Sequence, residues 1–224
     1  MEYLIDTANL ETIRHCNEFY PLSGVTTNPT LIAREKSDFF KLIKEIRTIL
    51  GPDKAMHVQT VQTTAEKIVE EAKLLRDAVG GKFFVKIPIS EEGLKATRML
   101  KEIGIGITMT AIFIPTQAMM AANAGASYVA PYVNRLDNVL GDGVRVVGEI
   151  VELFKTHGLN CRVLAASFTN CEQVHNCAME GCHAVTVSRE IFKASISHSM
   201  TDVAVAGFTR DWKDLYGDKT ILDF

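Results

Sequence analysis

The amino-acid sequence predicts an α/β protein in which eight parallel strands alternate with helices and close into a single (β/α)8 barrel. Three observations support this class. Short β-branched runs recur eight times, longer segments of helical period separate them, and 224 residues suit one domain with a sizeable core. An open three-layer sheet is the alternative. No G-x-G-x-x-G or G-x-x-x-x-G-K-[ST] occurs at a strand-to-helix turn, so the usual nucleotide-binding form of that sheet is not supported.

The predicted strands are short runs bounded by polar turn residues. Two to six polar residues separate the strands from the helical segments. The eight strands begin near residues 3, 23, 55, 82, 106, 127, 161 and 183 and read YLID, SGVTT, AMHVQT, KFFVKI, GITMT, SYVAPY, CRVLAAS and HAVTVS. Since (β/α)8 barrels need about 200 residues or more, eight such units favour the closed form.

Two helices are defined by apolar stripes of helical period. The first stripe lies between residues 65 and 79, at positions 65, 68, 69, 72, 75 and 79. The second lies at positions 96, 99, 100 and 103, where Ser90 predicts the start of the helix and Gly104 its end.

A further helix is predicted after the eighth unit, at about residues 201–217. Phe208, Trp212 and Leu215 lie on one stripe of this segment. A closed barrel does not need such a helix, so we expect its apolar stripe to contact a neighbouring subunit.

Composition excludes several classes of function. The net charge is −3, 23% of the residues are charged, and no basic run exceeds two residues, so neither a nucleic-acid face nor a membrane patch is indicated. The first residues, MEYLIDTANL, are too polar for a signal peptide, and no later apolar run is long enough to span a membrane. We therefore expect a cytoplasmic protein that acts on a small molecule.

The cysteines and histidines do not predict a metal site. Five cysteines with no C-x-x-C pair fit reduced thiols, and they are Cys16, Cys161, Cys171, Cys177 and Cys182. The nearest approach to a ligand pattern is the set His175, Cys177, Cys182 and His183, but its placement across a predicted helix and strand argues against zinc. We expect neither a metal nor a cofactor.

Lys86 stands out because it lies in the apolar run FFVKIP. A buried ammonium group is unfavourable unless it finds a partner or loses its proton. The position is therefore either a salt-bridged structural lysine or one whose chemistry needs a neutral amine. The local sequence leaves both interpretations open.

Each of the eight predicted strands ends in a polar residue. Active sites of such barrels lie at the carboxyl ends of the strands, so these side chains are expected to converge. They are Asp6, Thr26 with Asn28, Gln59, Lys86, Thr110, Tyr132 with Arg135, Ser167 and Ser188. Asn28 precedes Pro29 and also fits the cap of a helix that begins with proline.

A desolvated lysine at this position could act as a nucleophile. Burial lowers the pKa of an amine by up to several units, and a neutral amine condenses with a ketone. The resulting iminium accepts the electron pair released when the neighbouring carbon–carbon bond breaks, which requires no metal. Lys86 thus predicts Schiff-base chemistry.

Five motifs resemble the small transaldolase family, in the right order and over essentially the whole chain. They are DTAN at residues 6–9, GVTTNPT at 24–30, VKIP at 85–88, YVAPYVNRLD at 128–137 and LAASF at 164–168. The resemblance implies the same barrel fold. It also implies that Lys86 is the Schiff-base lysine and that Asp6 handles the sugar hydroxyls. Thr26, Asn28 and Thr110 would line the site.

The resemblance also implies that Arg135 and Ser167 bind the phosphate of the substrate. Arginine offers a planar fork of donors, and the loops after strands seven and eight commonly hold phosphate in these barrels. Arg135 could instead form a surface ion pair with Asp137. Ser188, followed by Arg189, stands where the family pattern has proline, so phosphate binding there is expected to differ.

Gln59 and Tyr132 indicate the aldolase branch of the family. Transaldolases typically have glutamate and phenylalanine at these two positions. The hydroxyl of Tyr132, beside a water held by Gln59 and Thr110, would then shuttle the proton. Tyr132 could instead be a core residue whose hydroxyl only makes a structural hydrogen bond.

The function expected from the resemblance is a metal-independent class I aldolase. It would cleave fructose 6-phosphate to dihydroxyacetone and glyceraldehyde 3-phosphate, or form the same bond. The alternatives are a transaldolase, which moves a dihydroxyacetone unit between sugar phosphates, and a non-catalytic sugar-phosphate binder. The resemblance further implies a homodecamer of two stacked pentamers.

Overall fold

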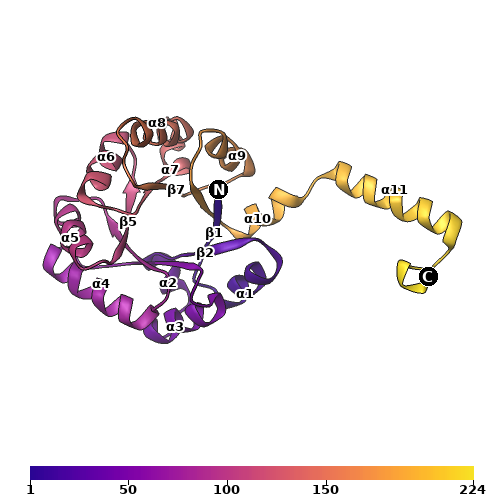
Figure 1. Ribbon diagram of the computed structural model, residues 1–224, viewed down its shortest axis with the longest axis horizontal. Coiled ribbons are helices and arrows are strands. Elements are labelled where there is room, and N and C mark those ends of the chain that lie inside the picture. Colours follow the sequence, from indigo (N-terminus) through magenta and orange to yellow (C-terminus); the bar gives the residue numbers. More distant parts are fainter.

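The computed structural model describes residues 1–224 and contains a closed barrel of eight parallel strands. Each strand pairs with the next in the sequence, and β1 also pairs with β8, which closes the barrel. Helices form a ring around the strands (Figure 1). The predicted (β/α)8 TIM barrel is therefore confirmed.

The strands begin within one residue of their predicted positions. They are β1 (Glu2–Asp6), β2 (Leu22–Thr26), β3 (Ala55–Gln59), β4 (Phe83–Pro88), β5 (Gly106–Ile112), β6 (Tyr128–Pro131), β7 (Arg162–Ala165) and β8 (Ala184–Val187). Their carboxyl ends all point to one face of the barrel, because the strands are parallel.

Most strands are followed by one helix. After β2 and β6 a short helix precedes the longer one, and after β8 one helix is followed by a second, longer one. The helices are α1 (Leu10–Phe19), α2 (Pro29–Arg34), α3 (Phe39–Leu50), α4 (Ala65–Val79), α5 (Glu91–Glu102), α6 (Pro115–Ala124), α7 (Val133–Asp137), α8 (Gly143–Thr156), α9 (Cys171–Met179), α10 (Arg189–Ile196) and α11 (Ser199–Tyr216), with a final 3-10 turn η1 (Ile221–Asp223).

The two predicted helical stripes are observed, with one correction. All six stripe residues of α4 are buried. In α5 the Ser90 side chain caps the helix by accepting a hydrogen bond from the Gly93 backbone N–H at 2.9 Å. Ile103, however, is 45% exposed, because the helix ends at Glu102 and Ile103 already belongs to the cap.

Two hydrophobic clusters hold the barrel together. The larger one joins outward-facing strand residues to the helices. The smaller one comprises Leu4, Ala55, Tyr128, Leu164 and Ala184. Side chains alternate along a strand, so these five residues share the inward face with the polar residues further along each strand. The barrel interior thus has an apolar layer near its amino-terminal end and polar side chains at the carboxyl ends of the strands.

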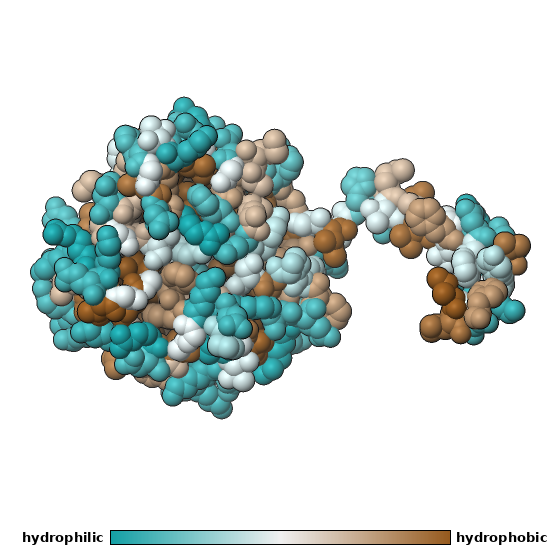
Figure 2. Space-filling model, viewed as in Figure 1, coloured by the Kyte–Doolittle hydropathy of each residue, from teal (hydrophilic) through white to brown (hydrophobic).

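Helix α11 leaves the barrel and extends away from it (Figure 1). None of its residues is buried, and its exposed side chains include the apolar residues Phe208 and Leu215. Apolar surface is visible along this segment in Figure 2. No helix of the chain, α11 included, is both long and apolar enough to cross a membrane.

Candidate active site

Lys86 lies inside the barrel on β4 and is 6% exposed. Its ammonium Nζ donates a hydrogen bond to the backbone carbonyl of Thr27 at 2.9 Å. It takes part in none of the ion pairs of the structure. Burial lowers the pKa of Lys86, and the charge of Asp6 opposes this only in part. The salt-bridged interpretation of Lys86 therefore finds no ion pair to support it.

A chain of hydroxyl and carboxylate groups links β1, β2 and β8 beside this lysine. The Thr26 hydroxyl donates to Asp6 Oδ1 at 2.6 Å and lies 2.7 Å from the hydroxyl of Thr186. Thr26 can give its proton to Asp6 and accept the one from Thr186. The hydrogen bond from Thr26 fixes the Asp6 carboxylate at the end of β1.

Gln59 and Asn28 present amide groups at the same end of the barrel. Gln59 is the register partner of Lys86 across β3 and β4, and its half-buried side chain makes no hydrogen bond to protein. Asn28 caps α2 as predicted: its Oδ1 accepts from the Leu31 N–H at 3.0 Å, and Pro29 is the first helical residue. The capping role uses only the oxygen of Asn28, so its amide nitrogen is left for another partner.

Tyr132 and Thr110 form a hydroxyl pair, with their oxygens 3.1 Å apart. Phe113 packs edge-on against the Tyr132 ring, with the ring centroids 5.6 Å apart. The Tyr132 side chain is half-buried. Its hydroxyl can either donate to Thr110 or accept from it, which is what a proton shuttle requires.

Arg135 is exposed, and its guanidinium lies over the Tyr132 ring at 4.8 Å from the ring centroid. The alternative ion pair with Asp137 is wrong. The two carboxylate oxygens of Asp137 accept from the Gly143 N–H and from Gln173 Nε2, both at 2.7 Å. Asp137 instead holds α7 against α8 and α9, and Arg135 has no carboxylate partner.

Ser167 and Ser188 lie on the loops after β7 and β8. Ser167 has a positive φ of 62°, and its carbonyl accepts from the Asn134 N–H at 2.7 Å, which joins this loop to α7 beside Arg135. Ser188 is the N-cap of α10, where its hydroxyl accepts from the Ile191 N–H at 3.4 Å. Both serines thus follow a strand at the carboxyl end of the barrel, and Ser188 also lies at the start of a helix.

Sequence reasoning did not select Thr27, Thr186, His57 or Thr108 as parts of the site. Thr27 matters through its carbonyl, and side-chain patterns cannot show that. The others could have been found by alternation, since His57, Thr108 and Thr186 each lie two residues before a selected strand-end residue. They therefore share its inward face.

His57 is fully buried below the lysine, with its Nδ1 at 2.8 Å from the hydroxyl of Thr108. Its ring stacks on Phe84 at 4.7 Å between centroids, and Nε2 has no hydrogen-bond partner. Burial, followed by the charges of Lys86 and Lys82, lowers its pKa to about 3. His57 is therefore a neutral imidazole at physiological pH.

No three or more His, Cys, Asp or Glu side chains are grouped to hold a metal ion. All five cysteines are free thiols. A cavity of about 630 Å³ opens between the loops that follow β3 and β4, with Gln59 and Pro88 among its lining residues. This cavity borders the carboxyl ends of β3 and β4.

The fold and site together define a (β/α)8-barrel protein whose candidate active site lies at the carboxyl ends of the strands, around a buried lysine without an ion-pair partner. The family model described as Transaldolase/Fructose-6-phosphate aldolase matches residues 3–219. The chain belongs to this family, which supports an enzyme of the aldolase or transaldolase kind acting on sugar phosphates.

Solved structures similar to this chain include those of mandelate oxidase. A mutant with a monooxide FMN adduct has a TM-score of 0.58 at 14% identity, over 93% of this chain and 69% of that one. The enzyme with benzoyl-formic acid has a TM-score of 0.57 at 14% identity, over 80% of this chain and 59% of that one. At such identity the likeness shows the barrel fold alone.

Proposed function

We propose that the protein is a class I aldolase that cleaves fructose 6-phosphate to dihydroxyacetone and glyceraldehyde 3-phosphate, or forms the same bond, through a Schiff base on Lys86. The observation that carries this proposal is the state of Lys86. It is buried, has no ion pair, and has a lowered pKa. A larger fraction of neutral amine is available to attack a ketone than in an ordinary lysine.

The proposed reaction begins with attack of the Lys86 amine on the C2 carbonyl carbon, and loss of water gives the iminium. Tyr132, which has given its own proton to the departing water, then takes the proton of the C4 hydroxyl through a site water. The C3–C4 electron pair moves into the iminium to form an enamine, and glyceraldehyde 3-phosphate leaves. Tyr132 returns the proton to C3, and water hydrolyses the new iminium. Dihydroxyacetone and free Lys86 are the products.

Several neighbours support these steps. The pairing of Tyr132 with Thr110 orients the phenol, and Gln59, beside Lys86 in the register, has its amide free to hold the water. Asp6 is held by Thr26 where it can accept hydrogen bonds from sugar hydroxyls.

Phosphate binding is proposed for Arg135, Ser167 and Ser188. Arg135 has no carboxylate partner and can offer its planar donor fork to a phosphate. Ser188 caps α10, so the backbone N–H groups at that helix start are close by. These three residues follow three consecutive strands, β6, β7 and β8.

Borohydride trapping tests the proposed function. The protein is incubated with fructose 6-phosphate or dihydroxyacetone, reduced, digested and analysed by mass spectrometry. We expect an adduct on Lys86 in the wild type and none in Lys86→Met, and reduction without substrate is the second control. Absence of an adduct on Lys86 rejects Schiff-base catalysis and leaves the non-catalytic sugar-phosphate binder.

Transaldolase is the second candidate function, supported by the same family. Aldolases and transaldolases differ in the fate of the enamine. An aldolase protonates it and releases the product, whereas a transaldolase keeps it until a sugar acceptor binds. The Tyr132 hydroxyl favours release. A coupled assay without acceptor should detect dihydroxyacetone. Transfer to erythrose 4-phosphate without any such release would replace the aldolase proposal by the transaldolase.

We also propose that α11 contacts a neighbouring subunit and that the protein assembles as two stacked pentamers. The support from the structure is that α11 buries none of its residues in its own chain while exposing Phe208, Trp212 and Leu215. The free cysteines fit the reducing cytoplasm in which we propose that the protein acts.

A further inference from the structure

A second cavity, of about 590 Å³, lies at the amino-terminal end of the barrel. It is lined by residues at the starts of β4, β6 and β7, together with Lys101 of α5. The candidate active site lies at the opposite ends of the same strands. The volume of the second cavity falls in the range of about 300–1,000 Å³ that is usual for small-molecule sites.

Aromatic rings form one wall of this cavity. Phe84 and Tyr128 both line it, and their rings meet edge-on with centroids 5.0 Å apart. His57 lies behind them, stacked on Phe84 and edge-on to Tyr128 at 5.4 Å. Three rings packed against one another make a rigid apolar surface on which a carbon skeleton can rest.

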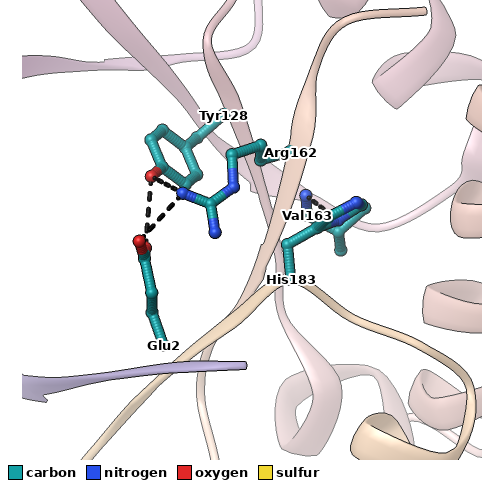
Figure 3. Close-up of polar contacts among 5 residues, drawn as sticks. All are labelled: Glu2, Tyr128, Arg162, Val163 and His183. Carbon is teal, nitrogen blue, oxygen red and sulfur yellow. Dashed lines mark hydrogen bonds and ion pairs between the residues drawn. The ribbon is translucent and has the colours of Figure 1, made fainter. Parts of the chain in front are cut away.

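Arg162 is held in place with part of its guanidinium uncommitted. Its Nη1 donates to Glu2 Oε1 at 3.0 Å and to the Tyr128 hydroxyl at 2.6 Å (Figure 3). The guanidinium carbon also lies 5.1 Å from the centroid of the Tyr128 ring. Neither Nε nor Nη2 has a protein partner, so two adjacent donors remain for a ligand.

The cavity carries an excess of positive charge. Lys82, Lys101 and Arg162 line it, and no acidic residue does. Neither lysine forms an ion pair, and the one ion pair of these three cations joins Arg162 to Glu2. Three cations against one carboxylate leave a formal charge of about +2, which favours an anion.

We propose that this cavity is a second ligand site, which binds a small organic phosphate. The free edge of Arg162 matches the paired oxygens of a phosphate, and Lys82 and Lys101 supply further charge-assisted donors. The organic part of the ligand packs against Phe84 and Tyr128. This site is separate from the proposed aldolase chemistry, which takes place at the other end of the barrel.

Calorimetric titration tests the site in the Arg135→Ala protein, because that change weakens phosphate binding at the active-site end. The probes are inorganic phosphate and phenyl phosphate. We expect one site per chain, with phenyl phosphate bound more tightly because its ring can contact the aromatic wall. Lys82→Met and Lys101→Met should each weaken binding by about tenfold or more, since each removes a charge-assisted bond.

The controls separate this site from other effects. Lys95→Met removes an exposed lysine that pairs with Glu66 on the outer helices, and it should leave binding unchanged. Arg162→Lys keeps the charge but loses the donor fork and should weaken binding, with the melting temperature measured alongside to confirm folding. Absence of binding in Arg135→Ala, or binding unaffected by Lys82→Met and Lys101→Met, overturns the proposal. Borohydride trapping on Lys86 reports the aldolase proposal independently.

Discussion

The protonation state of Lys86 follows from two opposing effects of its surroundings. Burial favours the neutral amine, and Asp6 favours the ammonium ion, with burial the stronger. The folded protein therefore binds fewer protons at this group than the unfolded chain does between the lowered pKa and the ordinary lysine value of 10.5. In that window, the contribution of Lys86 to stability rises with pH.

Lys86→Met should be inactive and at least as stable as the wild type at neutral pH, because it removes an amine whose burial opposes folding. The advantage of the variant should shrink as the pH approaches 10.5. Urea unfolding at several pH values measures both effects. A loss of about 3–5 kcal/mol in Lys86→Met would indicate a buried salt bridge instead. Lys86→Arg should also be inactive, since guanidinium stays charged and forms no iminium.

Tyr132→Phe should lower cleavage of fructose 6-phosphate by about a hundredfold or more, the usual contribution of an acid–base group. The adduct on Lys86 should still form, since iminium formation can draw on other groups. Steady-state kinetics and borohydride trapping measure the two effects. Adding Gln59→Glu should shift the ratio of transfer to release towards transfer. Unchanged cleavage in Tyr132→Phe would mean that the ring is only a core residue.

The acid sensitivity of the fold should depend on His57. Its pKa is lowered from 6.5 to about 3. As the pH falls from 6.5 to about 3, His57 is therefore protonated in the unfolded chain but stays neutral in the folded protein, which destabilises the fold. At about pH 4.5 this removes about 2–3 kcal/mol of stability. In the double variant His57→Phe with Thr108→Val that loss should be absent. The free energy of unfolding of the wild type and of the double variant is measured from pH 7 to about pH 4.5. The same dependence on pH in both proteins would contradict this role of His57.

At the scale of elements, strands and helices could be predicted from the sequence where their apolar residues recur with the period of a strand or a helix. The strands and α4 could be predicted because alternation and the 3.6-residue stripe record which face is buried. The exposure of Ile103 could not be predicted, because the apolar pattern does not show that α5 ends at Glu102. The carbonyl of Thr27 and the partners of Asp137 depend on backbone positions and long-range packing, which side-chain patterns do not encode.

The loop after β7 depends on the unusual backbone of Ser167. A φ of 62° is tolerated by glycine and is unfavourable for β-branched residues. Ser167→Val should therefore be less stable than Ser167→Gly, by about 1–2 kcal/mol in chemical unfolding. Both changes remove the hydroxyl, so both should raise KM for fructose 6-phosphate more than they lower kcat. An unchanged KM in Ser167→Gly would remove Ser167 from the phosphate site.

At the scale of the whole molecule, the direction of α11 could not be predicted from the sequence. The stripe of Phe208, Trp212 and Leu215 indicates that the helix has an apolar face but not what covers it. In the structure this face contacts no part of the barrel, and its three residues are 71%, 36% and 73% exposed. Such a helix contributes nothing to the core of its own subunit.

Deleting residues 199–224 should lower the mass of the assembly while leaving the circular dichroism of the barrel intact, because α11 is not part of the barrel core. Phe208→Lys with Leu215→Lys should have the same effect, and Lys213→Ala serves as the surface control. Light scattering at micromolar concentration measures the mass. A full-length protein that is already monomeric would contradict the proposed role of α11.

The hydroxyl contact between Thr26 and Thr186 joins positions 160 residues apart. At the usual rate of synthesis, about 5–20 residues per second, the second threonine is made about 10–30 seconds after the first. Throughout that interval β1 lacks its partner β8 and remains an open edge. The nascent chain is therefore exposed to aggregation at this edge until its last strand emerges, and the barrel cannot close before then.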